Sequence, residues 1–207
     1  MRSFGRSLRR HRVEFLLISG QAAVLYGAAT FSEDVDIWIR PTAVNLKRFL
    51  KALASLKARI HKLTPPLTLE NLRKGHGFHF VLPGPVYLDV MGKPPRVGAF
   101  ETCRRRSVRM KTEWGEILVL SIPDLVEIKK TRRLGDYETI SALARIHLAS
   151  DPARLRTWAA RNTFDDPSAL GKVARLQKAD LRYWKPILAD LRRWRREGAL
   201  LEEGSPV

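Results

Sequence analysis

The chain has 207 residues, and 38 Lys and Arg against 21 Asp and Glu give it a formal net charge of +17. Its single cysteine excludes an internal disulfide and a thiolate metal cluster, and no apolar stretch reaches the roughly 18 residues of a membrane-spanning helix. A cytoplasmic protein without membrane contact is the simplest expectation. The positive charge attracts polyanions, so RNA, DNA, nucleotides and acidic proteins are candidate partners, unless it reflects only a general basic bias.

The first 136 residues mix strands and helices. The basic segment over residues 1–12 is expected to be a tail that is available to a partner. Ser121, with Asp124 three residues later, has the pattern of a capping box that starts a helix. The other expected elements are strands over 14–18 and 35–39, helices over 21–26 and 42–60, paired strands over 78–82 and 86–90 around Pro83-Gly84-Pro85, and a hairpin over 108–111 and 117–120.

Strand patterns end near residue 137, and the remainder of the chain is expected to be helical. Helices are predicted over residues 137–149, 152–161 and about 168–197, followed by a frayed tail over 202–207. The change of pattern predicts two domains, an α/β domain over residues 1–136 and a C-terminal helical region over residues 137–207. The last helix has an apolar stripe that we expect to be core, formed by Leu181, Trp184, Leu188, Leu191 and Trp194.

Three aspartates stand in otherwise apolar strands. Asp34 and Asp36 flank Val35, and residues i and i+2 of a strand point to the same face, so these two carboxylates project together. Asp89 lies in the strand 86–90, where an aspartate is costly unless it is paired or bound to a metal. If the two strands are neighbours, the three carboxylates form a site for Mg²⁺ or Mn²⁺. Asp-x-Asp alone is more often a loop or a surface edge.

A glycine at a strand-to-helix junction is the first feature that favours phosphate binding. Gly20 follows Ser19 there, and glycine permits close approach of a ligand to the backbone. The amides of Gln21 and Ala22 would then open a helix N-terminus, which favours a phosphate. The alternative is that Gly20 only allows a turn.

A basic segment over residues 129–136 is the second such feature. Lys129, Arg133 and Asp136 have the i, i+4 and i+7 spacing of one helix face. A Lys and an Arg on one face can hold phosphate oxygens, with Asp136 orienting Arg133 or capping the next helix. A solvated basic face is the alternative.

Taken together, these segments resemble the minimal nucleotidyltransferase superfamily, in particular its AbiEii-like branch, which is known from toxin–antitoxin systems. The resemblance implies an α/β (α+β) fold of the nucleotidyltransferase type, a mixed sheet flanked by helices with a C-terminal helical extension. It covers about residues 13 to 145 and rests on Ser19-Gly20-Gln21-Ala22, Tyr26-Gly27-Ala28-Ala29, Phe31-Ser32-Glu33-Asp34-Val35-Asp36, Leu88-Asp89-Val90, and Glu127-Ile128-Lys129-Lys130-Thr131 with Arg133 and Asp136.

The resemblance also implies a role for individual residues. The catalytic and metal-binding residues would be Asp34, Asp36 and Asp89. The residues that bind the NTP would be Gly20 and Gln21 at its phosphates, Ser32 at the small hydroxyl position, and Lys129 and Arg133 at the triphosphate. The chain departs from the pattern at Gln21, where many members have Gly or Ser, and at Thr30, where many have Arg.

The leading hypothesis is therefore an enzyme that transfers NMP from an NTP, such as ATP, to an acceptor. RNA, above all tRNA, is favoured because basic residues occur in separate segments, at 2–12, 104–106 and 192–196. A protein or a small molecule such as an aminoglycoside is the alternative acceptor, and a toxin of this kind would have an antitoxin partner. Two other classes stay open: a non-catalytic nucleic-acid-binding protein on the same fold, and a structural partner that docks on an acidic protein.

Overall fold

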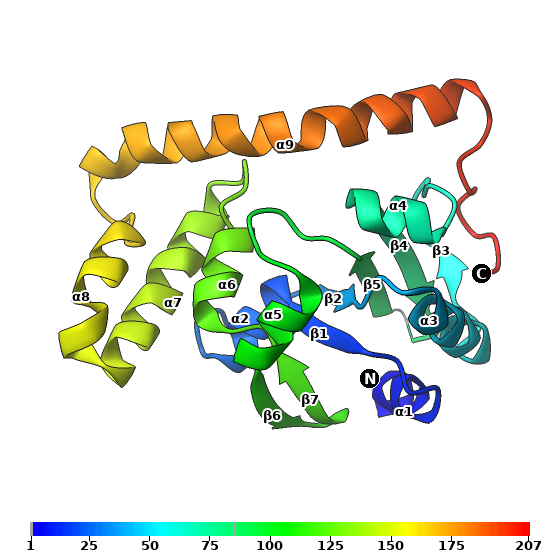
Figure 1. Cartoon of the computed structure of the whole chain (residues 1–207), viewed down its shortest axis with the longest axis horizontal. Helices are drawn as coiled ribbons and strands as arrows, with labels where there is room; N and C mark the ends of the chain where they lie inside the picture. The colour runs from blue at the N-terminus through cyan, green and yellow to red at the C-terminus, as the bar shows by residue number, and fades with distance from the viewer. Residues whose placement is uncertain (1, 85) are drawn as a thin grey trace.

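The strand patterns of the first half of the chain form one seven-stranded mixed sheet. In the computed structural model, which describes residues 2–84 and 86–207, the strand order is β3-β4-β5-β2-β1-β7-β6 (Figure 1). The pairs β2–β5 and β1–β7 are parallel and the other neighbours are antiparallel. The strands are β1 (Phe15–Ile18), β2 (Asp34–Ile39), β3 (Arg59–Ile60), β4 (Gly77–Leu82), β5 (Val86–Met91), β6 (Val108–Thr112) and β7 (Gly115–Val119).

Helices flank this sheet and continue beyond it. The predicted fold class, a mixed sheet flanked by helices with a C-terminal helical extension, is confirmed. Met1 and Pro85, which belong to the predicted basic tail and to the predicted Pro83-Gly84-Pro85 turn, lie outside the described residues. The helices are α1 (Arg2–Arg10), α2 (Ser19–Leu25), α3 (Ala43–Ser55), α4 (Leu69–Lys74), α5 (Phe100–Arg106), α6 (Ile122–Ile128), α7 (Gly135–Ser150), α8 (Pro152–Arg161), the 3₁₀ turn η1 (Pro167–Ala169) and α9 (Leu170–Arg196).

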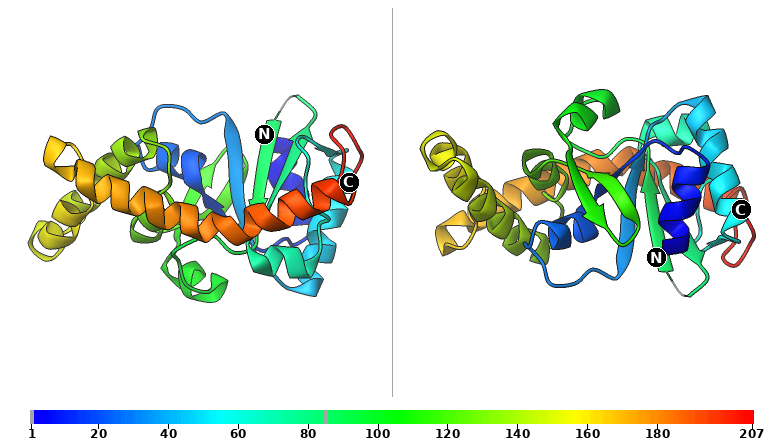
Figure 2. Two further views of the ribbon diagram at one scale, coloured as in Figure 1. Left: turned by 90° about the horizontal axis from the view of Figure 1, so that it is seen from above. Right: turned by 90° about the horizontal axis from the view of Figure 1, so that it is seen from below.

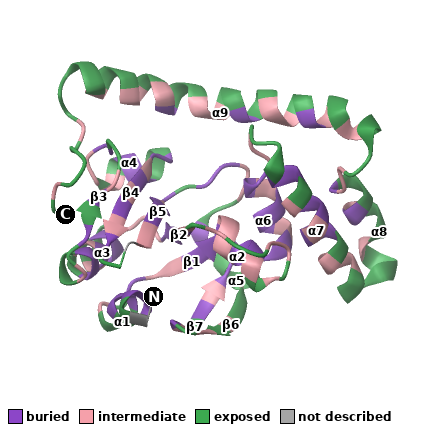
Figure 3. Ribbon diagram, turned by 180° about the vertical axis from the view of Figure 1, so that it is seen from behind, coloured by how far each residue is buried: buried purple, intermediate pink, exposed green. Residues whose placement is uncertain are grey.

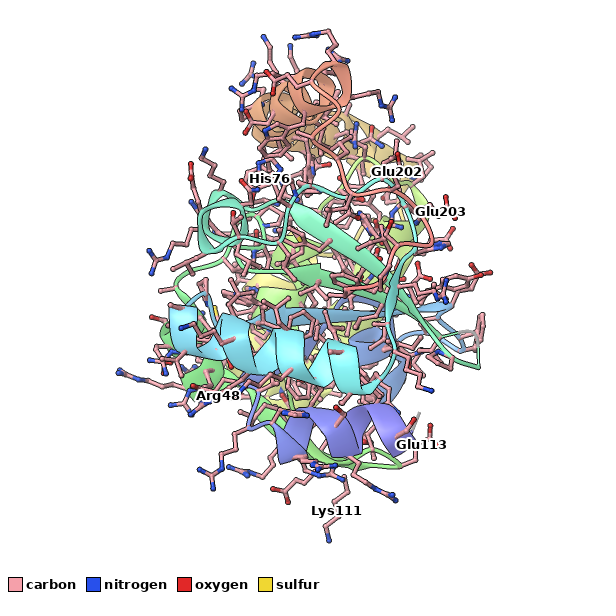
Figure 4. All side chains as sticks on the ribbon, turned by 90° about the vertical axis from the view of Figure 1, so that its right-hand side faces the viewer. Arg48, His76, Lys111, Glu113, Glu202 and Glu203 are labelled. Carbon is pink, nitrogen blue, oxygen red and sulfur yellow. The ribbon has the colours of Figure 1, made fainter. Side chains whose placement is uncertain are left out.

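The main core lies between the sheet and the pair α3 and α1. Val35 and Ile37 of β2 point to this side and are buried, and Phe49 of α3 packs edge-on against Phe80 of β4 with ring centroids 6.2 Å apart. Figure 4 shows α3 and α1 on one side of the sheet and α9 on the other. Alternation within β2 therefore sends Asp34 and Asp36 to the side away from this core, toward α9.

The basic N-terminal segment is a helix rather than the predicted tail. Phe4 and Leu8, four residues apart, are buried, and the Ser7 hydroxyl donates to the Ala52 carbonyl of α3 at 3.2 Å. The apolar residues occupy one face of α1 and most of the arginines lie on the others, an amphipathic pattern that the high arginine content conceals in the sequence.

The predicted helix over 42–60 is too long, because α3 ends at Ser55. Lys57 takes a positive φ of 52°, which turns the chain, and Ile60 then enters β3 as a buried strand residue. The predicted frayed tail over 202–207 is also wrong. The Ile60 amide donates to the Ser205 carbonyl at 2.9 Å, and the Leu201 amide donates to the Thr64 carbonyl at 2.8 Å, so the end of the chain pairs with the segment around β3.

Helix α9 crosses the whole molecule on the side opposite to α3 (Figure 2, left). Its fully buried positions recur every seven residues, at Val173, Asp180 and Ile187. The predicted core stripe is therefore only partly correct: Leu181 is 49% exposed, and the other four residues of the stripe are half-buried. The helix rests on the rest of the protein along one narrow line and keeps most of its surface in solvent, as Figure 3 shows.

The predicted capping box before α6 takes a different form. Ser121 is the N-cap residue, but its hydroxyl bonds the Asp124 carboxylate at 2.8 Å and makes no cap hydrogen bond to the backbone. Asp124 also accepts two hydrogen bonds from Arg106, at 2.7 and 3.1 Å, so this arginine of the 104–106 run is already paired. No helix in the described part of the chain combines the length and the apolar character needed to cross a membrane.

Candidate active site

The three aspartates meet at the centre of the sheet. β2 and β5 are adjacent and parallel, and their register places Asp36 directly beside Asp89. Asp34 is two residues before Asp36 on the same face, and all three line one cleft of about 450 Å³. The structure thus brings together the carboxylates that the sequence places on two separate strands. The other residues that line this cleft are Ser19, Gly20, Ser32, Glu33, Lys129, Arg133, Gly135 and Asp136.

The negative charges in this cleft disfavour one another. Burial, and then the charge of Asp89, raise the pKa of Asp36 to about 7, and Asp34 adds to the rise. A hydrogen bond from Ser19 and the charge of Lys129 act in the opposite direction without cancelling it. A cation bound among the carboxylates would relieve this repulsion, and three carboxylates are the hard oxygen donors that Mg²⁺ and Mn²⁺ prefer. The donor set therefore fits such an ion.

A histidine that sequence reasoning missed is bound to the third carboxylate. His79 of β4 pairs in register with Asp89 of β5, and its Nδ1 lies 2.7 Å from Asp89 Oδ1. No three Asp, Glu, His or Cys side chains in residues 2–84 and 86–207 are grouped as a ready-made metal cluster. The available signal was the position of His79 between the buried Phe78 and Phe80, which directs its ring to the face that carries the aspartates.

Gly20 is required by a neighbour within the protein. Helix α2 begins at Ser19, two residues earlier than predicted, and Ser19 has a positive φ of 57°. A Cβ atom on Gly20 would stand 2.2 Å from the Ser32 hydroxyl oxygen, which is far inside contact distance. The glycine therefore lets the loop before β2 approach α2 and places Ser32 at the edge of the cleft.

Gln21 lies away from the cleft. Its side-chain amide donates to the Ser32 carbonyl at 2.9 Å, and the residue lines a neighbouring cavity beside Trp114 instead. Its backbone lies in the first turn of α2, but its side chain points away from the cleft. Of the five residues expected to bind the nucleotide, Gly20, Ser32, Lys129 and Arg133 line the cleft and Gln21 does not.

The predicted helix face over 129–136 is wrong, because α6 ends at Ile128 and α7 begins only at Gly135. The loop between them still brings the three predicted residues together. Asp136 accepts from Lys129 Nζ at 2.9 Å and from Arg133 Nε at 3.0 Å, and it also bonds the Thr131 hydroxyl. Burial alone would raise the pKa of Asp136, but Lys129, Thr131 and Arg133 outweigh it and hold that pKa below the usual range.

The two cations of this loop differ in their access to the cleft. The Lys129 side chain is 7% exposed and lies within the protein against Asp136, whereas the Arg133 side chain is 74% exposed. Arg133 can therefore reach a ligand while Asp136 fixes its orientation. Lys129 supplies a buried positive charge to both Asp136 and Asp36.

Helix α9 forms the far wall of a smaller cavity that adjoins the cleft. Trp184 and Asp180 line this cavity together with Asp36 and Lys129. Asp180 is almost fully buried and is held by Arg96 at 3.3 Å, by Arg132 at 3.5 Å and by the Trp184 indole at 3.1 Å. These contacts fasten α9 to the loops that border the site.

Comparisons with known proteins show a distant similarity to solved structures. No model of a known protein family matches the sequence, and no curated protein matches it. Among solved structures, the chain is similar to TM1012 from Thermotoga maritima, a protein proposed to be a nucleotidyltransferase, with a TM-score of 0.43 and 16% sequence identity over 76% of this chain and 88% of that chain. A similarity at this level carries no functional argument, so the function is inferred from the side chains of the cleft.

Proposed function

We propose that this chain is a metal-dependent nucleotidyltransferase that transfers NMP from an NTP to an acceptor. The observation that carries the proposal is the pairing of Asp36 with Asp89 on adjacent parallel strands, with Asp34 on the same face of one cleft. Lys129 and Arg133 line the same cleft. A cleft with both carboxylates and cations suits a metal-bound polyphosphate, because the carboxylates can hold the metal and the cations can contact the phosphates.

Asp34, Asp36 and Asp89 would hold Mg²⁺ or Mn²⁺. The raised pKa of Asp36 supports this assignment, since the carboxylates repel one another in the absence of a cation. When bound, the ion would neutralise charge on the triphosphate and make an acceptor hydroxyl more acidic. His79 contacts Oδ1 of Asp89, so the other carboxylate oxygen of Asp89 would be the one that binds the ion.

The phosphates would be bound by other residues that line the cleft. Arg133 is exposed and oriented by Asp136, which makes it the side chain best placed to contact a phosphate directly. Gly20 and Ser32 also line the cleft, and the Ser32 hydroxyl, which donates to the Asp34 carbonyl at 3.1 Å, would have to exchange that bond to donate to a phosphate. The Gln21 side chain is bound to the Ser32 carbonyl, so we assign it no phosphate contact.

In the proposed reaction, an oxygen of the acceptor forms a bond to the α-phosphorus of the NTP. The bond from that phosphorus to the bridging oxygen breaks, and pyrophosphate leaves. Asp89 would accept the proton of the attacking hydroxyl, with His79 fixing the orientation of its carboxylate. Arg133 would stabilise the negative charge of the departing pyrophosphate.

We propose RNA, in particular tRNA, as the acceptor, on the basis of the net charge of +17. A toxin role with an antitoxin partner rests on the family resemblance alone and stays a prediction, as does a cytoplasmic location. A protein or small-molecule acceptor is the alternative.

Incubation with each α-labelled NTP, Mg²⁺ and total cellular RNA or protein tests the reaction. We expect label in a band that nuclease removes and protease leaves, and none with Asp36→Asn. Glu203→Gln, which neutralises an exposed carboxylate in the C-terminal tail, is the matched control and should keep full activity. Absence of transfer with every NTP, in a protein that still binds RNA, would favour the non-catalytic class instead.

A further inference from the structure

The charges of α9 are divided between its two sides. The helix has 27 residues and contains nine Lys and Arg but only two acidic residues, Asp180 and Asp190. Both acidic residues face the protein: Asp180 is held by Arg96, and Asp190 lies 3.2 Å from His76. No negative side chain of α9 is therefore left on its solvent side.

Six cations form a row on that solvent side, four of them in the first half of the row and two near its C-terminal end. At about 100° per residue, they fall within about 60° of the direction opposite to Asp180. All six are exposed, and none forms an ion pair within residues 2–84 and 86–207. The row, which we call the α9 basic row, consists of Arg175, Lys178, Arg182, Lys185, Arg192 and Arg196.

The α9 basic row is long, and its cations are three or four residues apart except between Lys185 and Arg192. From Arg175 to Arg196 it extends about 32 Å at 1.5 Å per residue. The positions between its cations on the same side are small residues such as Ala174 and Ala189. A flat cationic surface of this kind fits a rigid row of phosphates. It lacks the aromatic side chains that bind single strands by stacking. Most of the apolar side chains that an amphipathic helix would insert into a membrane are buried or half-buried on the other side of α9.

We propose that the α9 basic row binds the phosphate backbone of double-stranded RNA without sequence specificity. The reasons are the length of the row, the absence of acidic and aromatic side chains along it, and the position of α9 beside the cleft, where Trp184 and Asp180 of the same helix line the adjoining cavity. Duplex RNA is recognised mainly through its shape and its phosphates, which is the chemistry this surface offers. This inference deepens the proposed function and rests on RNA being the acceptor; it assigns α9 to bind a double-stranded stem of that RNA.

The other basic segments are less suited to this role. In the 104–106 run, Arg104 pairs with Glu101 at 3.0 Å and Arg106 with Asp124 at 2.7 Å. Helix α1 is short and packs against α3 on the opposite side of the sheet (Figure 4). Among the residues that the structure describes, only α9 presents a long unpaired row on the side of the sheet where the aspartates lie.

The test measures binding of a labelled RNA duplex of about 16 base pairs, the span that double-strand-binding domains cover, across a salt series without nucleotide. The variant Arg182→Gln/Lys185→Gln removes two adjacent cations from the row. The matched control Lys47→Gln/Lys51→Gln removes two exposed cations from α3, on the other side of the sheet, and changes the net charge equally. Glutamine preserves helix propensity in both pairs, and circular dichroism checks the fold.

We expect the α9 variant to lower the slope of log affinity against log salt by about two units, nearly one for each lost phosphate contact, and the α3 control to leave it unchanged. Equal losses in both variants, or no loss in either, would overturn the inference. A single strand bound as tightly as the duplex through the same residues would overturn the assignment to double-stranded RNA. Tighter binding to vesicles of anionic lipid than to the duplex would point to a membrane surface instead.

The outcome is separable from that of the proposed reaction. A chain that binds duplex RNA through α9 but transfers no NMP would uphold this inference and reject the reaction. If instead the chain transfers NMP to RNA, and the Arg182→Gln/Lys185→Gln variant changes neither this transfer nor duplex binding, the reaction would be upheld and this inference rejected.

Discussion

His79 Nδ1 lies 2.7 Å from Asp89 Oδ1 across the antiparallel pair of β4 and β5. The contact fixes the orientation of the carboxylate that we propose as the proton acceptor. It also explains how a partly buried aspartate is tolerated beside Asp36 in the described conformer, since the imidazole satisfies one of its oxygens.

Replacing this histidine should affect turnover more than nucleotide binding. We expect His79→Ala to lower kcat about 10- to 100-fold, the usual effect of removing a residue that orients a metal ligand, while KM for the NTP changes little. His79→Asn keeps a donor near the position of Nδ1 and should restore part of the activity. Steady-state kinetics over a Mg²⁺ series measures both values, and an equal loss in the two variants would show that the hydrogen bond is not what matters.

Neutralising Asp36 should stabilise the protein while it abolishes transfer. The folded-state pKa of about 7 lies above the unfolded value of about 3.9, so the charged form is disfavoured by folding. The wild type then loses stability as the pH rises from about 4 through about 7, and Asp36→Asn does not. We expect the variant to be more stable by about 1–4 kcal/mol at pH 8 and by little at pH 4.

Urea unfolding at several pH values without divalent cations measures this difference. Addition of Mg²⁺ should reduce the difference in free energy of unfolding between the two proteins, because only the wild type has all three carboxylates to bind the cation. A wild type that is the more stable protein at pH 8 in the absence of cations would contradict the repulsion on which the metal assignment depends.

Substitutions of Lys129 and Arg133 should have different effects: Lys129 is expected to matter for stability and Arg133 for NTP binding. Lys129→Met leaves the buried Asp136 without its closest cation and should lower the free energy of unfolding by about 2–4 kcal/mol. Arg133→Gln removes an exposed side chain and should change stability by less than about 1 kcal/mol, while NTP binding weakens about 10- to 100-fold. Calorimetric titration with a non-hydrolysable NTP, beside urea unfolding, distinguishes them. Similar stability losses in both would show that Arg133 is also structural.

Acidification should loosen one end of α9. The His76 side chain is 1% exposed, and its Nδ1 has no hydrogen-bond partner among the described residues. Its ring packs on that of Trp194 with the two ring centroids 4.9 Å apart. Burial lowers the pKa of His76, and the nearby Lys74 adds to this, although Asp190 acts in the opposite direction. The folded-state pKa of His76 lies below its unfolded value of about 6.5, so protonation of His76 favours the unfolded state. The free energy of unfolding that depends on neutral His76 is therefore complete above about pH 6.5 and falls as the pH decreases below it.

We expect hydrogen exchange in the C-terminal half of α9 to rise between about pH 7 and pH 5 after correction for the intrinsic rate. His76→Phe keeps the packing on Trp194 without a titrating group and should remove this rise. An increase of the same size in the variant would assign the effect to other residues.

Much of the local structure could be predicted from the residues alone. Alternation in β2 puts Val35 and Ile37 on one face and Asp34 and Asp36 on the other, and this outcome follows from the strand geometry whatever the neighbouring strands are. Two of the predictions that failed did so because the local pattern was incomplete. Residues 56–60 continue the apolar spacing of α3, yet the positive φ of Lys57 ends the helix there. The many arginines of α1 concealed Phe4 and Leu8, which are buried by contacts with elements distant in the sequence.

The sequence by itself thus determined the strands, the mixed α/β class and the presence of three aspartates in apolar strands. Only the tertiary structure decided that Asp36 lies beside Asp89, that His79 binds Asp89, and that Lys129 and Asp136 meet through a loop rather than along a helix. It also decided which side of α9 is left to solvent. The physical reason is that strand faces and helix periodicity are set by neighbouring residues, whereas register and docking depend on how distant segments bury apolar surface against one another.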